Sequence, residues 1–181
     1  MTRIGILMIL ATSFAAAAQQ KSDKKAAPPH PKPDPALVQA FGKAVGAWKC
    51  TGTTTLPQEM GGGQMKTKGT MTIRKEVGGF AYSGDYKMAK TKAFPGMHAR
   101  MLWTYDPAAK KFYELSADDG GGAVRGESDG VKDGKMVWSE EGTMMGKPSK
   151  STTTITGIGK KAIDIQFDMG DMKGTDHCKK G

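Results

Sequence analysis

Two cysteines are the residues of this chain best placed for covalent chemistry, which here would be a disulfide bond. Cys50 lies in the first segment with β-type alternation, and Cys178 lies in the last. Cys50 alternates in step with Trp48 and Cys178 with Met172, so both thiols are expected to project to the same side of a sheet. If the first and last strands are neighbours, the two side chains are within disulfide reach. We therefore predict a disulfide between Cys50 and Cys178, with two buried or metal-binding thiols as the alternative.

A second kind of chemistry is suggested by the methionine-rich end of the chain. The sequence has 13 methionines, and residues 169–178 combine thioether, imidazole and thiol groups, which suit Cu(I). Methionine is also a common filler of irregular cores, and alternation places Met172 and Cys178 on one face of a strand and His177 on the other. We therefore assign no metal site and no cofactor, and keep soft-metal (copper) binding by this segment as an alternative.

The residues that catalysis would need are not arranged in any familiar motif. Of the three histidines, His30 lies in a proline-rich stretch and His98 on the predicted wet face of a strand. The sequence contains no Gly-x-Ser-x-Gly, phosphate-binding loop or His-Glu-x-x-His pattern. Glu140 and Glu141 are neighbours on a predicted strand, so they point to opposite faces and cannot act on one bond. We expect that the protein is not an enzyme.

Alternation with period two dominates the chain after residue 46 and predicts an all-β domain. Asp34 as N-cap and Pro35 in the first turn predict one short helix before it, which ends near Gly46. Breaks that contain Gly, Asp or Pro then recur about every 8 to 14 residues, as in an antiparallel meander. The ten predicted strands begin near Ala47, Gln64, Gly79, Met97, Lys111, Gly122, Lys135, Lys150, Lys161 and Asp171.

So many strands with one short helix would leave long edges and a large apolar surface in an open sheet. Closure removes the edges. We therefore predict a closed antiparallel up-and-down barrel of about ten strands with one short N-terminal helix, and a two-sheet sandwich as the alternative. A barrel of this size encloses more volume than its side chains easily fill. The residues predicted to line the interior and to bind a small hydrophobic ligand are Trp48, Met71, Ile73, Phe80, Tyr82, Tyr86, Met101, Trp103, Ile163, Ile165 and Phe167.

The start of the chain reads as a secretory signal peptide over residues 1–18, with Arg3 ahead of an apolar stretch and small residues before Gln19. A Pro- and Lys-rich linker follows over 19–35, and the domain over 36–181. No later apolar run approaches the length of a membrane span. We therefore expect a periplasmic or secreted protein. The net charge is +9, but the lysines are scattered, which indicates a solvated basic surface and no nucleic-acid partner.

Several short motifs resemble a known family. Gly46-Ala47-Trp48 after a helix is similar to the Gly-x-Trp start of the first strand in lipocalin-like (calycin) barrels, where the Trp closes one end. The segment 104–113, followed by the glycine-rich 120–126 and by Asp129-Gly130, resembles the bacterial domain-of-unknown-function family 1579. The resemblance covers about residues 40–179 and implies the same calycin-like barrel. It carries no chemical signature, because its motifs are a turn, a plug and a hairpin.

The predicted function is that of an exported β-barrel that binds a small hydrophobic ligand in its interior. A structural barrel whose apolar residues simply pack as a core is the first alternative. The resemblance adds haem binding as another, since some calycin-like barrels use a late histidine as the iron ligand and His177 occupies such a position. Copper binding by the Met/His/Cys-rich C-terminal segment completes the alternatives. The sequence specifies no oligomeric state.

Overall fold

The first helix begins where the sequence places its signals. The computed structural model describes residues 30–92 and 94–181. In it the Asp34 carboxylate accepts a hydrogen bond from Ala36 N at 2.8 Å, and helix α1 spans Pro35–Phe41. A 3-10 turn, η1 (Gly42–Ala44), then leads toward the first strand. The capping aspartate and the proline in the first turn thus act as predicted.

Eleven strands follow α1 in the described part of the chain. They are β1 (Gly46–Thr55), β2 (Gln64–Glu76), β3 (Ala81–Met88), β4 (Met97–Asp106), β5 (Lys111–Asp118), β6 (Ala123–Ser128), β7 (Val131–Lys132), β8 (Lys135–Met144), β9 (Lys147–Thr156), β10 (Ala162–Met169) and β11 (Met172–Lys180). Two 3-10 turns, η2 (Gln58–Met60) and η3 (Val77–Gly79), flank β2. The ten predicted strands all start within three residues of an observed one, and the two-residue β7 is an addition.

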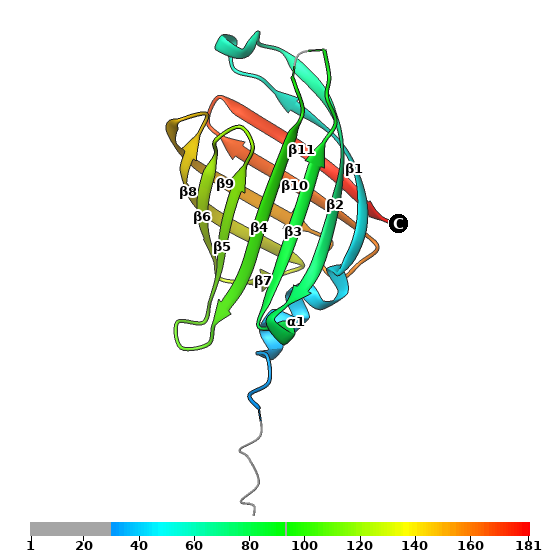
Figure 1. Cartoon of the computed structure of the whole chain (residues 1–181), viewed down its shortest axis with the longest axis vertical. Coiled ribbons are helices and arrows are strands. Elements are labelled where there is room, and N and C mark those ends of the chain that lie inside the picture. Colours follow the sequence, from blue (N-terminus) through cyan, green and yellow to red (C-terminus); the bar gives the residue numbers. More distant parts are fainter. Residues whose placement is uncertain (1–29, 93) are drawn as a thin grey trace, which may run out of the picture. The chain divides into compact units, whose positions relative to one another are not determined.

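The strands form one antiparallel sheet that closes on itself. Within the series β1 to β6, each strand pairs with its neighbours in sequence. The same is true within the series β8 to β11. β1 also pairs with β11, and β6 pairs with β8, so the circle of ten strands has no free edge apart from the short β7 beside β8. Figure 1 shows the resulting barrel. The closed antiparallel barrel is confirmed, and the sandwich alternative is wrong.

Helix α1 covers one end of the barrel (Figure 1). Its residues Leu37 and Phe41 are buried in the core. The Phe41 ring stacks on Trp103 and Tyr82, with ring centroids 5.1 Å and 5.6 Å apart. Aromatic contacts of this kind add stabilisation beyond the apolar area that they bury. The helix therefore makes this end of the barrel a packed core.

One strand start differs from its predicted position for a clear reason. β9 begins at Lys147 and not near Lys150, because Met145 and Gly146 both have positive φ and form a two-residue hairpin turn. Pro148, which reads as a strand breaker, pairs with Thr143 in the second position after the turn. In such a hairpin this is a position whose backbone N–H faces away from the partner strand, so proline removes no hydrogen bond there.

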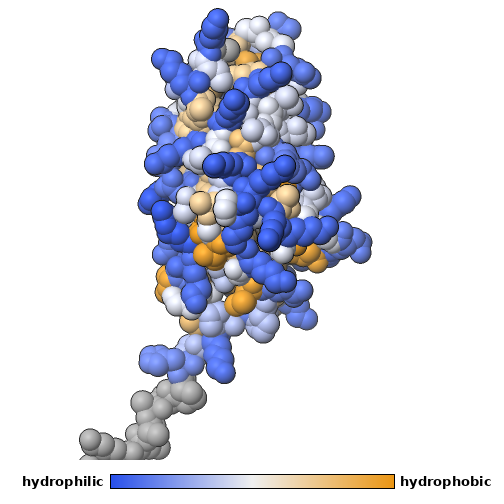
Figure 2. Space-filling model, turned by 90° about the vertical axis from the view of Figure 1, so that its right-hand side faces the viewer, coloured by the Kyte–Doolittle hydropathy of each residue, from blue (hydrophilic) through white to orange (hydrophobic). Residues whose placement is uncertain are grey.

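The chain divides into two units, Met1–Pro31 and Lys32–Gly181, and of the first only His30 and Pro31 are described. The predicted signal peptide and most of the predicted linker therefore lie outside the described residues. The side of the molecule in Figure 2 is covered mainly by hydrophilic side chains, with small separate hydrophobic areas. Over residues 30–92 and 94–181, no helix has the length and apolar character needed to cross a membrane.

Candidate functional site

Most of the residues predicted to line the interior do lie on the inner face of the barrel. Tyr86, Met101 and Ile165 are half-buried and pack against the core, and Phe167 is also half-buried. The six that belong to the buried core itself are Trp48, Met71, Ile73, Tyr82, Trp103 and Ile163. The structure thus brings together ten of the eleven predicted residues.

Phe80 is the exception, and its prediction as a lining residue is wrong. Its side chain is 41% exposed. Alternation puts Phe80 in step with the buried Tyr82, but β3 begins only at Ala81. Gly78 and Gly79 have positive φ, and the Phe80 N–H bonds back to Val77 O at 3.2 Å. Phe80 therefore belongs to the hairpin between β2 and β3, where the inward and outward alternation of the strand does not yet apply.

Three inward-facing aromatic rings lie against glycines of the neighbouring strand. A Cβ added to Gly84 on β3 would lie 2.5 Å from the Trp103 ring on β4, so the ring occupies the space that a side chain would need. The three pairs are Trp103 over Gly84, Tyr86 over Gly69 and Phe167 over Gly174. Glycine permits this close approach because it lacks a side chain. Each of these rings therefore lies against the backbone of the adjacent strand.

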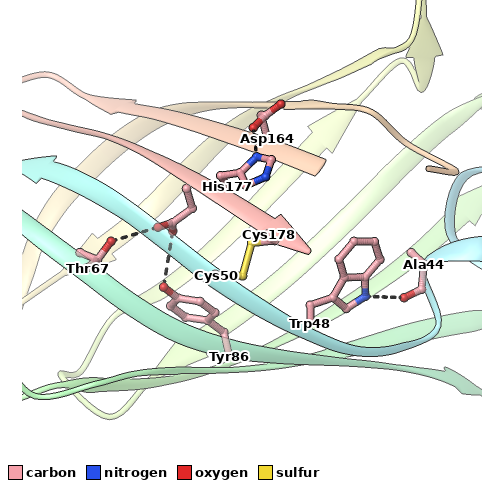
Figure 3. Close-up of a disulfide and its surroundings, with 9 residues drawn as sticks. Ala44, Trp48, Cys50, Thr67, Tyr86, Asp164, His177 and Cys178 are labelled. Carbon is pink, nitrogen blue, oxygen red and sulfur yellow. Dashed lines mark hydrogen bonds and ion pairs between the residues drawn. A yellow bond between two sulfur atoms is a disulfide. The ribbon is translucent and has the colours of Figure 1, made fainter. Parts of the chain in front are cut away.

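An acidic group faces inward beside the disulfide. Asp176 on β11 accepts hydrogen bonds from Thr67 Oγ1 at 3.0 Å and from Tyr86 Oη at 3.4 Å (Figure 3). Burial raises the pKa of Asp176, and these two hydrogen bonds offset part of that effect. The pKa of Tyr86 is raised by burial first and by the charge of Asp176 second. These three side chains form a polar group on an inner wall whose predicted lining residues are apolar or aromatic.

Two glutamates also face inward, on either side of Gly126. Glu114 on β5 and Glu140 on β8 both pair with Gly126 on β6, which lies between them. Glu114 Oε2 accepts a hydrogen bond from Trp103 Nε1 at 2.6 Å. Burial raises the pKa of Glu114 to about 7; the Trp103 hydrogen bond lowers it, and the charge of Glu140 raises it further.

Glu140 is held in place by two hydroxyl groups of β9. Its Oε2 atom accepts hydrogen bonds from Ser151 Oγ at 2.6 Å and from Thr153 Oγ1 at 3.0 Å. The next residue, Glu141, faces outward and pairs with Arg125. The prediction that Glu140 and Glu141 point to opposite faces is therefore confirmed.

Three carboxyl groups face the interior, although the lining residues predicted from the sequence are all apolar or aromatic. The sequence does indicate these carboxyl groups, because each lies two residues from a buried residue of the same strand and so shares its inward face. Glu114 follows the buried Phe112 by two residues, Glu140 follows Trp138, and Asp176 precedes Cys178. The predicted lining residues are apolar or aromatic and do not include the acidic residues in step with them. The carboxyl groups are tolerated inside because each accepts hydrogen bonds.

Trp138 was not among the predicted lining residues, although it is completely buried. It lies two residues from Glu140 on the inner face of β8, and its ring packs against Gly126, 3.4 Å from the position of an added Cβ. Its indole Nε1 has no hydrogen-bond partner among the described residues. A buried donor without a partner is uncommon in native proteins. It leaves a polar atom inside the barrel that protein groups do not satisfy.

The predicted disulfide is confirmed. Cys50 on β1 and Cys178 on β11 are direct register partners, their Cα atoms are 4.0 Å apart, and their sulfur atoms are bonded. Figure 3 shows the bond close to Trp48, whose Nε1 donates to Ala44 O at 2.8 Å. Because Trp48 is 2% exposed, it closes the barrel end near α1 as the sequence predicts.

The C-terminal ligand set considered for copper does not converge. Met169 and Met172 pair with each other at the end of the barrel away from α1, which we call the open end. The Cys178 sulfur is bonded to Cys50 in the disulfide. His177 points to the outer face, where its Nδ1 lies 2.6 Å from Asp164 Oδ1 (Figure 3). No group of three or more His, Cys, Asp or Glu side chains suited to a metal ion occurs within the described ranges.

Both strand histidines lie outside the barrel. His98 Nε2 is 3.2 Å from Asp85 Oδ2, and this contact is the main reason why the pKa of Asp85 is lowered. His177 is bound to Asp164 in a similar way. The haem alternative needs an inward-facing histidine as iron ligand, and neither of these two side chains reaches the interior.

A shallow groove of about 820 Å³ lies on the outer surface near the open end of the barrel. Its walls carry hydroxyl, amide and charged groups, among them Thr53 and Thr175, whose Oγ1 atoms are 3.4 Å apart. By strand parity most of its side chains face away from the interior. Ser151 and Phe167, which belong to the inner face, also line it.

Comparison with known proteins supports the fold and identifies no family. The chain matches the crystal structure of Rv2717c from M. tuberculosis with a TM-score of 0.62 and 10% sequence identity, over 83% of this chain and 99% of that chain. The S-type phycobiliprotein lyase CPES from Guillardia theta matches with a TM-score of 0.35 and 10% identity, over 78% of this chain and 90% of that chain. No protein-family model matches the chain, and no curated protein sequence matches it. The chain shares its fold, a closed antiparallel β-barrel, with Rv2717c, and at this identity the likeness extends to the fold alone.

Proposed function

We propose that this protein is an exported, non-enzymatic binding protein that takes a small amphipathic molecule into the half of its barrel away from α1. The observation that carries the proposal is the arrangement of aromatic rings on glycines. Trp103, Tyr86 and Phe167 each lie against a glycine of the neighbouring strand, an arrangement that supports room for a ligand at the centre of the barrel. Barrels of this size commonly use such space for one small ligand.

The chemistry of the inner wall defines the kind of ligand. The apolar part consists of side chains such as Ile165 and Phe167, which are half-buried at the open side of the core. The polar part is Asp176, Glu114 and Glu140, whose carboxyl groups accept hydrogen bonds. A molecule with an apolar body and hydrogen-bond donors suits this wall better than the purely hydrophobic ligand expected from the sequence.

The remaining parts of the proposal rest on the sequence. The signal-peptide pattern of residues 1–18 supports export to the periplasm or beyond, and a disulfide is stable in that compartment. The motifs from Gly46 to Gly130 support membership of domain-of-unknown-function family 1579. Binding without catalysis is supported by the outward position of His98 and His177.

The test uses the neutral fluorescent probe N-phenyl-1-naphthylamine with the mature protein. Wild-type protein is expected to enhance its fluorescence with a dissociation constant in the micromolar range, of the order that apolar burial of such a probe supports. Ile165→Trp should fill the open half and weaken binding about tenfold or more. The control Gln166→Trp places the same ring on the outer face and should bind like wild type.

Native mass spectrometry of freshly purified protein complements this titration, because a copurified molecule would appear as added mass. If the native mass equals the polypeptide mass and the probe does not bind, the barrel is a structural one and the proposal fails. Equal binding by Ile165→Trp and wild type would also overturn it, since the probe would then sit elsewhere. Thermal melts of both variants establish that each is folded.

A further inference from the structure

We propose that Glu114 and Glu140 form a site for an organic ammonium group with a hydrogen-bond acceptor on the same molecule. This inference rests on the proposed binding function and names the class of ligand. It starts from the row of residues across β5, β6 and β8, in which Gly126 separates the two glutamates.

Because Gly126 has no side chain, Glu114, Glu140 and the Trp138 ring approach one another over its backbone. A Cβ at this position would lie 3.1 Å from Glu140 Cγ and 3.5 Å from Glu114 Cβ. Both glutamate side chains therefore rise from the wall around one glycine, with their carboxyl groups on the inner side. A cation held between the two carboxyl groups would interact with both.

Each carboxyl group has one oxygen already engaged and one free. Oε2 of Glu114 accepts from Trp103, and Oε2 of Glu140 accepts from Ser151 and Thr153. In the part of the chain that the structure describes, neither Oε1 atom has a protein hydrogen-bond partner. A fixed carboxylate with a free oxygen is an acceptor prepared for the N–H groups of a ligand.

No protein cation compensates these acids. Among residues 30–92 and 94–181, no lysine, arginine or histidine forms an ion pair with Glu114 or Glu140. The other inward-facing acid, Asp176, adds to the negative potential. Lys180 on β11 is exposed and donates to Lys43 O near Trp48, at the end of the barrel that α1 covers. Burying uncompensated acids is costly, and a bound cation relieves that cost.

The indoles beside the glutamates add two further elements of recognition. Trp103 and Trp138 provide aromatic surface, which attracts organic cations. Trp138 Nε1 is a completely buried donor without a partner among the described residues. An acceptor oxygen on the ligand would satisfy it, which is why the ligand carries an acceptor as well as an ammonium group.

Binding should be linked to pH through Glu114. The pKa of its buried carboxyl is raised to about 7, so a fraction of the free protein carries a proton there at neutral pH. The other charged groups that face it are Glu140 and, further along the inner wall, Asp176. A bound ammonium favours the ionised form, so affinity should rise between about pH 6 and about pH 8 as the proton no longer has to be expelled.

The experiment compares tyramine with 4-ethylphenol, which lacks the ammonium group and is otherwise alike. Calorimetric titrations at about pH 8 should show that wild-type protein binds tyramine about tenfold or more tightly than 4-ethylphenol. Glu114→Gln and Glu140→Gln should each remove most of this preference, since glutamine keeps the size of the side chain and loses its charge. The matched control is Glu141→Gln, which removes the outward-facing neighbour of Glu140 and should retain the preference.

Each other outcome decides against the inference in a distinguishable way. Equal binding of the two phenols means that the interior accepts ligands but has no cation site. Loss of the preference in Glu141→Gln as well as in the inner variants means that overall charge, and not this site, attracts tyramine. If neither phenol binds while N-phenyl-1-naphthylamine does, the cation site is wrong and the proposed function stands. If none of the three binds, both proposals fail.

Discussion

Cys50 and Cys178 are direct partners across the seam where the first long strand, β1, meets the last, β11. Their separation in sequence is 128 residues. The bond therefore joins the two strands whose pairing closes this side of the barrel, and it lies on the inner face, beside Trp48 (Figure 3). Formation of this bond therefore requires an oxidising environment, the pairing of β1 with β11, and the register that places Cys50 opposite Cys178.

Removing the disulfide should lower the free energy of unfolding by up to about 5 kcal/mol, because the unfolded chain gains the freedom of a very long loop. The double variant Cys50→Ala/Cys178→Ala and the chemically reduced wild type should both show this loss in urea denaturation. Alkylation of denatured, unreduced protein should label no thiol. Two labelled thiols in protein recovered from an oxidising compartment would contradict the bond.

Trp48→Ala should lower the free energy of unfolding by about 3 to 5 kcal/mol, because it leaves a cavity at the end of the barrel that Trp48 closes. Trp48→Phe keeps most of the packing and loses the hydrogen bond to Ala44 O, so its cost should be nearer 1 kcal/mol beyond the change in volume. Chemical denaturation measures both. A loss below about 1 kcal/mol for Trp48→Ala would mean that Trp48 contributes little to the core.

The stability of the protein should fall as pH rises from about 4.5 to about 7. Glu114 has a folded-state pKa of about 7 against an ordinary value of 4.5, so in this window the folded state binds more protons than the unfolded state. Its contribution is complete below about pH 4.5 and is lost as pH rises through 7, by on the order of 3 kcal/mol. Urea denaturation at several pH values measures it. The raised pKa of Asp176 acts in the same direction.

Glu114→Gln should remove most of this pH dependence, while Glu141→Gln should keep it. Glu141 is a suitable control because it is exposed and paired with Arg125. An unchanged pH dependence in Glu114→Gln would show that another group is responsible.

Gly84→Ala should destabilise the barrel by about 1 to 3 kcal/mol, because the new methyl group would overlap the Trp103 ring. The double variant Gly84→Ala/Trp103→Leu should lose less stability than the two single variants together, by at least about 0.5 kcal/mol. A thermodynamic cycle from urea denaturation gives this coupling. Additive losses would mean that the ring does not rest on the glycine in solution.

The alternation of apolar and polar residues was enough to predict the closed sheet. Alternation placed Trp48 and Cys50 on one face of the first strand and predicted that Cys178 of the last strand shares that face. The observed register of β1 and β11 confirms this. Asp34 and Pro35 likewise predicted the helix start. Such features are predictable because they depend on neighbours in sequence and on the strict two-residue period of a strand.

Where strands begin and end was harder to predict. Phe80 has the parity of an inner residue, yet the hairpin before β3 holds it outside. Pro148 reads as a breaker, but it stands at a strand position where no backbone N–H is required. Both errors arise because parity describes a residue only after pairing has begun, and pairing depends on the partner strand.

The sequence by itself determined the strand pattern, the disulfide and the plug at Trp48, because each follows from period-two alternation and the need to close the sheet. Only the tertiary structure decided the character of the interior. Glu114 and Glu140 come from strands far apart in sequence, and Gly126 between them becomes significant only when register places all three in one row. Whether an aromatic residue fills the centre or lies along the wall depends on a glycine in the next strand, as with Trp103 over Gly84. Such contacts are set by three-dimensional register, which no local pattern specifies.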